Sequence, residues 1–387
     1  RKETIHWECR IVRILSHCKE AQNMHLVSVI SSKPFLLAYL SSLSSKTYRM
    51  IDTRIIVRGN RLIGLCIAVL AIGLNLTSCT KEPIEDSTPY TAVSTGNNEG
   101  FLYCSDYSGN FEIWKFEDEQ HIQLTVDEEW DCWWPQISPS GGQILYYKSK
   151  AGRDANDFDN ASLWVMTKSG QAQQELIAQD AFGWIMQGLA NWSYDETQIV
   201  MAAVDPGIGT WQLYLTDPEG RSPERISTRD DVNYLDPIFD IDDQFVFCSV
   251  APEGLTGEAD HEIFKIDILT GEEIRLTNNS VSDHHPALSP DGEFLVYETL
   301  DDPSYLSIGK WSINELNLTT FSETVILEDD QINLFPKYDA TGEYIYYTRL
   351  NVESFLMTGA RLNRSDLSSS LLVPTDRNSF NLDPYSF

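Results

Sequence analysis

The sequence predicts an all-β protein, a six-bladed β-propeller of four-stranded antiparallel blades. A repeat of about fifty residues runs from Phe101 to the C-terminus and contains short apolar runs separated by turn residues. The repeat shows no helical pattern of ten residues or more. Aromatic residues make up 11% of the chain, which favours strands over a helical bundle. Blades repeated around an axis form a propeller.

Each repeat begins with a unit built around a proline. Its fullest form is residues 285–292 (HPALSPDG), in which SPDG favours a type I turn. We expect Pro286 to begin the innermost strand, because the first residue of a strand is one of the few that need no N–H. The unit recurs at Pro135, Ala190 (where the proline is lost), Pro237, Pro286 and Pro336.

Three further runs follow each unit and complete the blade. The second strand of the blade comes directly after the turn. The third carries an apolar–aromatic pair, spaced by 50 residues at Ile113, Leu163, Leu213 and Ile263. The fourth is a short outer strand, at Leu124, Leu176, Ile226, Leu276, Ile326 and Leu372. Such regular spacing predicts one four-stranded blade per repeat.

The two ends of the repeat region predict a shared sixth blade. Before the first proline unit stand three strands without an innermost one, at 101–105, 111–116 and 122–125. Residues 382–385 (LDPY) begin a unit that is not completed, and we align its Pro384 with the other prolines. One C-terminal strand and three N-terminal strands then form a complete blade. This closure removes the open sheet edges.

The first hundred residues divide into three segments. Residues 1–49 show no sustained periodicity, and we interpret them as an upstream extension outside the functional protein. Residues 50–78 have a basic start and then an uncharged apolar run at 62–76, as expected of a signal peptide; an uncleaved anchor is the alternative. Residues 79–100 are rich in Ser, Thr, Pro and acidic groups, which predicts a flexible tether before the propeller at 101–387.

Two stretches resemble known families. Residues 76–79 (LTSC) resemble a bacterial lipobox, which implies lipid attachment at Cys79, and residues 81–82 (KE) weakly resemble export signals of Bacteroidetes-type surface lipoproteins. Residues 286–292 (PALSPDG), 134–141 (WPQISPSG) and 275–277 (RLT) resemble TolB-type, WD40-like (PD40) repeats. The resemblance covers residues 101–387. It implies a six-bladed propeller in the cell envelope that contacts other proteins. Together with the lipobox-like stretch it predicts an outer-membrane lipoprotein that faces the periplasm or the surface.

Composition limits the partners. The formal net charge is −30, and the excess of acidic residues lies entirely after residue 78. Such a charge argues against binding to nucleic acid and against docking to anionic lipid headgroups. We therefore expect membrane contact only through the lipid anchor, and a monomer. No CxxC pair, Walker A, GxGxxG or GxSxG motif occurs, so we expect no cofactor, no metal and no hydrolase triad.

The loops that precede the proline units are expected to line one mouth of the pore. We call the residues selected there the predicted rim. They are Trp130, Asp131, Trp184, Gln187, Asn233, Tyr234, Asp283, His284 and Asn333. Indole faces beside carboxylates suit a sugar ring or a peptide. The alternative is that the aromatic residues, Trp133 and Trp134 included, pack between blades.

Two stretches offer metal-ligand chemistry. Residues 283–285 (DHH) are the one place where an imidazole for a metal or general base is available, although no second His pair occurs and a scaffold role is the alternative. Residues 154–160 carry oxygen ligands for Ca²⁺ but lack the Gly and Glu of an EF-hand, so an acidic loop is the alternative.

Together these features predict a lipid-anchored, non-enzymatic binding or scaffold module that presents its pore face to a protein, peptide or glycan. The alternative is a propeller enzyme, such as a metal-dependent polysaccharide lyase of the oligogalacturonate type. A lyase for acidic sugars needs a basic residue to hold the substrate carboxylate. The predicted rim contains no Lys or Arg, which counts against that alternative.

Overall fold

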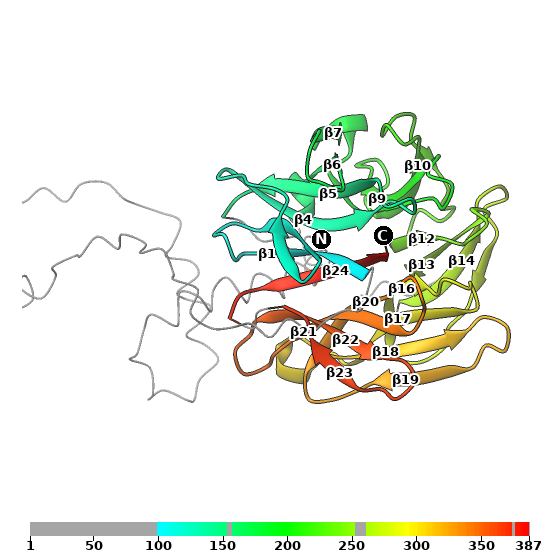
Figure 1. Cartoon of the computed structure of the whole chain (residues 1–387). Coiled ribbons are helices and arrows are strands. Elements are labelled where there is room, and N and C mark those ends of the chain that lie inside the picture. Colours follow the sequence, from blue (N-terminus) through cyan, green and yellow to red (C-terminus); the bar gives the residue numbers. More distant parts are fainter. Residues whose placement is uncertain (1–98, 153–156, 252–260, 374–375, 387) are drawn as a thin grey trace, which may run out of the picture. The chain divides into compact units, whose positions relative to one another are not determined.

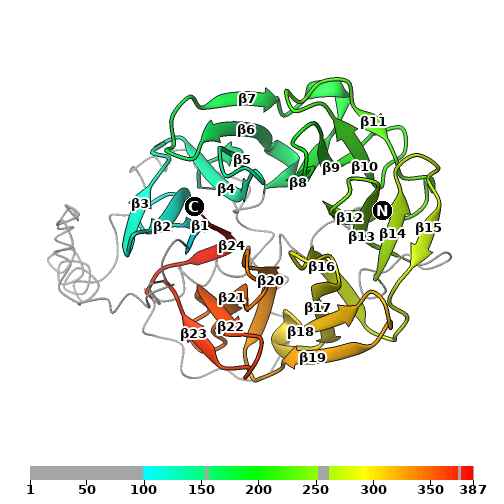
Figure 2. The same cartoon turned by 45° about the vertical axis from the view of Figure 1, so that its right-hand side comes forward.

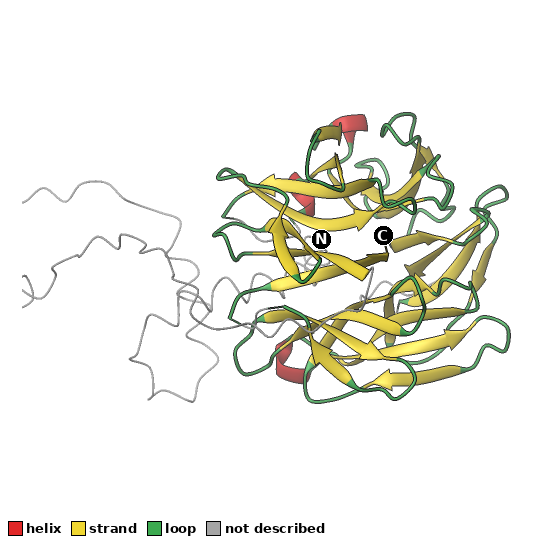
Figure 3. Cartoon of the chain, in the orientation of Figure 1, coloured by secondary structure: helices red, strands yellow, loops and turns green. Residues whose placement is uncertain are grey.

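The computed structural model describes residues 99–152, 157–251, 261–373 and 376–386. These residues form six four-stranded antiparallel sheets around a central axis (Figures 1 and 2). Beside the strands, Figure 3 shows only short 3₁₀ turns, at Phe158–Asn160, Ala181–Gly183 and Tyr305–Ser307. The predicted fold class is confirmed. In the described part of the chain no helix is long and apolar enough to cross a membrane.

The blades follow one another along the chain. Within each blade the strands are ordered from the innermost, at the central channel, to the outermost. Blade 1 holds β4 (Trp130–Ile137), β5 (Gln143–Lys150), β6 (Ser162–Thr167) and β7 (Gln174–Ile177). Blade 2 holds β8 (Met186–Trp192), β9 (Ile199–Val204), β10 (Trp211–Thr216) and β11 (Glu224–Arg225). Blade 3 holds β12 (Tyr234–Phe239), β13 (Phe245–Val250), β14 (Glu262–Asp267) and β15 (Glu273–Arg275).

The remaining blades complete the ring. Blade 4 holds β16 (Ser282–Leu288), β17 (Phe294–Asp302), β18 (Lys310–Asn317) and β19 (Glu323–Leu327). Blade 5 holds β20 (Ile332–Tyr338), β21 (Tyr344–Leu350), β22 (Met357–Asn363) and β23 (Ser369–Leu371). Blade 6 holds β24 (Ser379–Ser386), β1 (Glu99–Ser105), β2 (Glu112–Glu117) and β3 (Gln120–Gln123).

The two ends of the described chain share blade 6, as predicted. Strand β24 pairs antiparallel with β1, with Phe101 opposite Pro384. The carboxylate of Asp106 accepts hydrogen bonds from the backbone N–H of Asn378 (3.0 Å) and from its Nδ2 (2.9 Å). Closure therefore depends on contacts between residues more than 270 positions apart in the sequence.

A β-bulge interrupts every innermost strand at the same place. The residue there has a positive φ of 48–60°, at Trp134, Leu189, Asp236, His285, Phe335 and Asn381. The pairing register with the next strand shifts at this point in all six blades. In the blades that carry a proline, it follows the bulge residue, where its missing N–H breaks no regular ladder.

The bulges correct two details of the sequence analysis. Pro286 does not begin its strand, because β16 already starts at Ser282. The residue of blade 6 that takes the proline position is Leu382, directly after Asn381, and not Pro384. The alignment of the last unit on Pro384 is therefore wrong by two residues.

The core lies between the blades. Blades pack face to face, so both faces of an inner strand are covered and large aromatic side chains are fully buried there. Trp133, for example, is 0% exposed and stacks on Tyr147, with ring centroids 5.0 Å apart. For Trp133 the alternative interpretation, packing within the fold, is the one observed.

Candidate ligand pocket in the central channel

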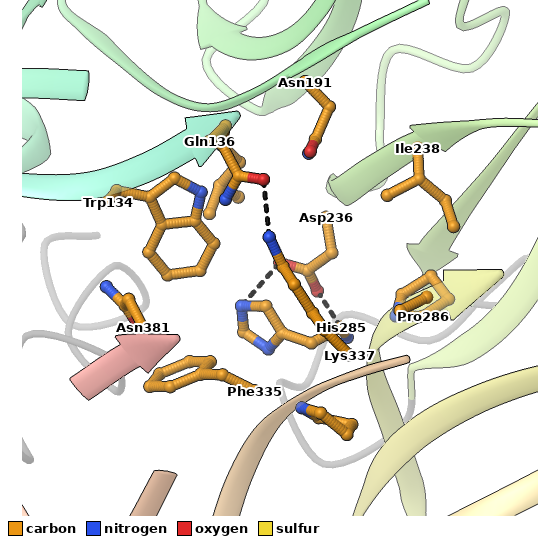
Figure 4. Close-up of a pocket in the computed structure, with 13 residues that line it drawn as sticks. Trp134, Gln136, Asn191, Asp236, Ile238, His285, Pro286, Phe335, Lys337 and Asn381 are labelled. Atoms are coloured by element: carbon orange, nitrogen blue, oxygen red, sulfur yellow. Dashed lines mark hydrogen bonds and ion pairs between the residues drawn. The ribbon is translucent and has the colours of Figure 1, made fainter. Parts of the chain in front are cut away.

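A cavity of about 50 Å³ is lined by residues from all six innermost strands (Figure 4). Every strand contributes its bulge residue, and five of the six also contribute the residue two positions further on. The lining residues are Trp134, Gln136, Leu189, Asn191, Asp236, Ile238, His285, Pro286, Ala287, Phe335, Pro336, Lys337 and Asn381.

The bulges explain why these side chains reach the channel. Along a regular strand successive side chains point to opposite faces of the sheet. In a propeller both faces are covered by neighbouring blades, so a regular inner strand would offer the channel mainly its backbone. A bulge re-aims a side chain, and six bulges at one level produce a ring of six side chains.

Aromatic and imidazole rings bridge the channel at the level of the bulges. Trp134 on blade 1 lies 5.5 Å from His285 on blade 4, measured between ring centroids, and 5.4 Å edge-on from Phe335. The rings of His285 and Phe335 are 4.7 Å apart. Blades 1 and 4 are opposite each other in the ring order, so these contacts span the axis (Figures 2 and 4).

A buried ionic cluster joins blades 3 and 4 beside these rings. His285 Nε2 lies 3.0 Å from Asp236 Oδ1, and His285 Nδ1 lies 2.9 Å from Glu298 Oε1. Both carboxylates are only 2% exposed. Burial by itself lowers the pKa of His285, but Asp236 and Glu298 outweigh it and hold the pKa well above 6.5. The two carboxylates on either side of the His285 ring therefore favour its protonated, imidazolium form.

The neighbouring groups support the same charge state. Burial raises the pKa of Asp236, but the imidazoles of His285 and His284 outweigh it and hold the pKa well below 3.8. Asp236 also accepts hydrogen bonds from the Ser249 hydroxyl and, at 3.2 Å, from the backbone N–H of His285. Burial lowers the pKa of His284, and its contact with Asp236 raises it above 6.5 overall.

The pocket also contains a lysine that the sequence analysis missed. Lys337 Nζ donates to Gln136 Oε1 at 2.5 Å and to Asp383 Oδ1 at 2.6 Å. The predicted rim held only residues before each proline, whereas Lys337 follows Pro336. The repeat could have identified Lys337, because the residue directly after the proline position lines the pocket in five of the six blades.

Two buried polar side chains in the pocket wall have unused hydrogen-bonding atoms. Asn381 is 5% exposed, and neither its Nδ2 nor its Oδ1 has a hydrogen-bond partner among the described residues. Trp134 is 6% exposed, and its Nε1 has no partner in the same set. Most buried polar atoms in folded proteins are paired, so these two side chains are the candidates in the pocket wall for hydrogen bonds to a ligand.

The predicted rim lies elsewhere, and none of its nine residues lines the cavity. Seven of the nine are buried by 90% or more: Asp131, Trp184, Gln187, Tyr234, Asp283, His284 and Asn333. Gln187 Nε2, for example, donates to the Ala178 and Ala161 carbonyls at 2.8 and 3.0 Å. Trp130 is 38% exposed and Asn233 is half-buried. Binding by the predicted rim stays a prediction.

The structure offers little for the metal hypotheses. Within the described ranges no three His, Cys, Asp or Glu side chains are grouped so that they could hold a metal ion. His284 Nε2 is hydrogen-bonded to the Ser282 hydroxyl at 2.8 Å and its Nδ1 faces Asp236. Residues 153–156 of the acidic loop, and Cys79 with the rest of residues 1–98, lie outside the described residues.

No protein-family model and no curated protein matches this sequence. Solved structures do match it in fold. TolB from Acinetobacter baumannii superposes with a TM-score of 0.59 at 12% identity, over 74% of this chain and 66% of that one. A structure assigned as TolB from Agrobacterium tumefaciens gives 0.54 at 14% identity, over 75% and 98%. A chain of a nidogen/laminin complex also gives 0.54, at 10% identity over 74% and 98%.

Six four-stranded sheets around a lined channel define the class of this protein, a six-bladed β-propeller. Within that class its fold is TolB-like. At 10–14% identity the likeness concerns the fold alone. The nidogen/laminin chain superposes as well as the Agrobacterium structure does, so the likeness specifies no partner.

Proposed function

We propose that this chain is a non-catalytic binding module of the bacterial cell envelope, held at the outer membrane by a lipid on Cys79. Its central pocket receives a short protruding group of a protein or peptide partner. The observation that carries this proposal is the pocket itself, an aromatic and apolar wall with a few convergent polar side chains, as in ligand sites generally. The resemblance to TolB-type repeats supports a protein partner.

The size of the pocket favours a peptide over a glycan. For comparison, an engineered apolar cavity that binds one benzene ring measures roughly 150 Å³. The pocket measures about 50 Å³, which suits the end of one side chain better than a sugar ring.

One observation favours the alternative, a lyase for acidic sugars. Lys337 supplies the basic residue that the predicted rim lacked. Its ammonium is already paired with Asp383, and the described residues provide no three-donor group for the metal that such a lyase would use. The binding module is therefore the better-supported function.

Filling the pocket is expected to weaken partner binding by about tenfold or more, since the binding group would lose its space. Ala287 lines the cavity, and Ala287→Phe places a ring in it. Hits from a peptide and glycan array probed with the full chain would be titrated against this variant. Leu269→Phe, at a site 93% exposed, is the matched control and should bind like wild type.

The outcomes separate the candidate functions. Hits that bind Ala287→Phe as tightly as Leu269→Phe would place the binding site outside the channel. Glycan hits without peptide hits would mean that the partner is a glycan and not a protein. Stoichiometric metal in the purified chain, lost in both His284→Ala and His285→Ala, would favour the enzyme.

Replacing the predicted lipid attachment residue should release the protein from the membrane. Stable anchoring needs more than one acyl chain, and processing at Cys79 would supply them. We expect the wild-type chain in the membrane fraction and Cys79→Ser in the periplasmic extract, as measured by fractionation and immunoblotting. Cys104→Ser, at a buried thiol in β1, is the control. Membrane retention of the Cys79→Ser variant would contradict the anchor.

A further inference from the structure

We propose that the pocket recognises a neutral carboxamide, the side chain of a glutamine or asparagine presented by a partner protein. The inference rests on the proposed function and deepens it by naming the chemical group. It follows from three features of the pocket: its charges, its unused hydrogen-bonding atoms and its size.

The charged side chains of the pocket are already paired with one another. His285 is paired with Asp236 at 3.0 Å and with Glu298 at 2.9 Å. Lys337 is paired with Asp383 at 2.6 Å. A further charged group would lose its water on entering and would find no uncommitted counter-charge in the wall. A neutral polar group avoids this cost.

The unused atoms match a carboxamide. Asn381 offers one donor, Nδ2, and one acceptor, Oδ1, and the indole of Trp134 offers a second donor, Nε1–H. A primary amide has a carbonyl oxygen with two acceptor sites and an NH₂ group with two donors. A primary amide therefore has a donor and an acceptor that complement the Asn381 amide and a second acceptor site that complements the Trp134 indole N–H. A carboxylate would leave Asn381 Oδ1 without a donor.

The shape of the site agrees with this group. A carboxamide is small and planar, so it is compatible with a cavity of about 50 Å³ whose walls include the flat rings of Trp134 and Phe335. Asn381 is on β24 and Trp134 on β4, so the two residues that would bind it come from neighbouring blades (Figure 4). Binding of the group would therefore involve the blade that closes the ring.

The repeats themselves provide well-tolerated variants. Blade 2 has Leu189 at the bulge with a φ of 60°, so Asn381→Leu places there a residue that the same bulge already accepts. Blade 5 has Phe335 with a φ of 54°, so Trp134→Phe likewise copies a natural bulge and removes only the Nε1–H and part of the ring. Thermal melts of both variants would verify that they fold.

The test uses three tripeptides, acetyl-Gly-X-Gly-N-methylamide, in which X is Gln, Glu or Met. The N-methylamide cap makes the glutamine side chain the only primary amide, and the three side chains have similar length. Titration of the full chain, followed by ligand-detected NMR, should show the Gln peptide binding about tenfold more tightly than the other two. Asn381→Leu should abolish this preference, and Trp134→Phe should reduce it.

Each other outcome overturns the inference in a distinguishable way. Equal or tighter binding of the Glu peptide would show that the pocket selects an anion through Lys337. Equal binding of the Met peptide would show an apolar site. An unchanged Gln preference in Asn381→Leu would place recognition on other atoms. If array hits still depend on Ala287 while none of the tripeptides binds, the carboxamide is wrong and the proposed function stands; if no hit depends on Ala287, both are wrong.

Discussion

Deletion of residues 379–387 is expected to unfold the propeller as a whole. The deletion removes β24, the innermost strand of blade 6, and with it the side chains of Phe380, Leu382 and Tyr385, which are 0%, 0% and 6% exposed. Burial of a large apolar side chain contributes about 1.5–3 kcal/mol, so these three contribute roughly 5–9 kcal/mol. That is comparable to the whole stability of a typical domain, about 5–15 kcal/mol.

The loss would extend beyond one blade. Strand β24 pairs with β1 and also packs against β4 of blade 1 and β21 and β22 of blade 5. Without it, β1 has a free inner edge and the neighbouring blades lose part of their cover. Circular dichroism melts and size-exclusion chromatography measure the effect. Ile274→Ser, on the outer strand β15 and 47% exposed, should melt close to wild type. A truncated chain that melts cooperatively at the wild-type temperature would contradict the closure mechanism.

Asp236→Asn is expected to destabilise the protein by about 3 kcal/mol. Breaking a buried ion pair costs about 3–5 kcal/mol, and the lower end applies because Glu298 remains as a partner for His285. The substitution keeps the shape of the side chain and suits the positive φ of 55° at this position. The loss of stability therefore measures the effect of removing the negative charge. Urea unfolding measures it. Asp242→Asn removes the same charge at an exposed turn and should change stability little.

The same cluster predicts a pH dependence with a definite sign. The folded pKa of His285 lies above its unfolded value of 6.5, so its contribution is complete below pH 6.5 and is lost as pH rises through the folded pKa. The folded pKa of Asp236 lies below 3.8, so its contribution is complete above that pH and is lost in stronger acid. The stability difference between wild type and Asp236→Asn should therefore be largest between pH 3.8 and 6.5 and should shrink at alkaline pH. A difference that grows above pH 6.5 would contradict a protonated His285.

Much of the architecture follows from local sequence patterns. Apolar runs of four to six residues, turn residues between them and a period of about fifty residues predict the blades and their order. The incomplete units at the two ends predict the shared blade, which the pairing of β24 with β1 confirms. The blades are readable because strand and turn patterns depend on residues close together in the chain, and the shared blade is readable because the repeat leaves one incomplete unit at each end.

The sequence locates the pocket poorly, for a specific reason. Counting back from each proline selects residues such as Gln187 and Asp283, whose side chains pack between blades. The bulge shifts the pairing register, so the residue immediately before the proline position faces the channel instead. Asp236 and His285 are recognisable as recurring polar residues before a proline, but in the sequence that position looks like ordinary scaffold.

The sequence by itself therefore determined the fold class and the number of blades, because strand periodicity and turn chemistry are local. It also determined how the ring closes, because the repeat leaves one incomplete unit at each end. The tertiary structure alone decided which side chains meet in the channel. A bulge exists only where a strand is paired with its neighbour, and contacts such as Lys337 with Asp383, 46 residues apart, exist only once blades stand side by side. The charge balance and the unused amide of Asn381 are properties of that packing.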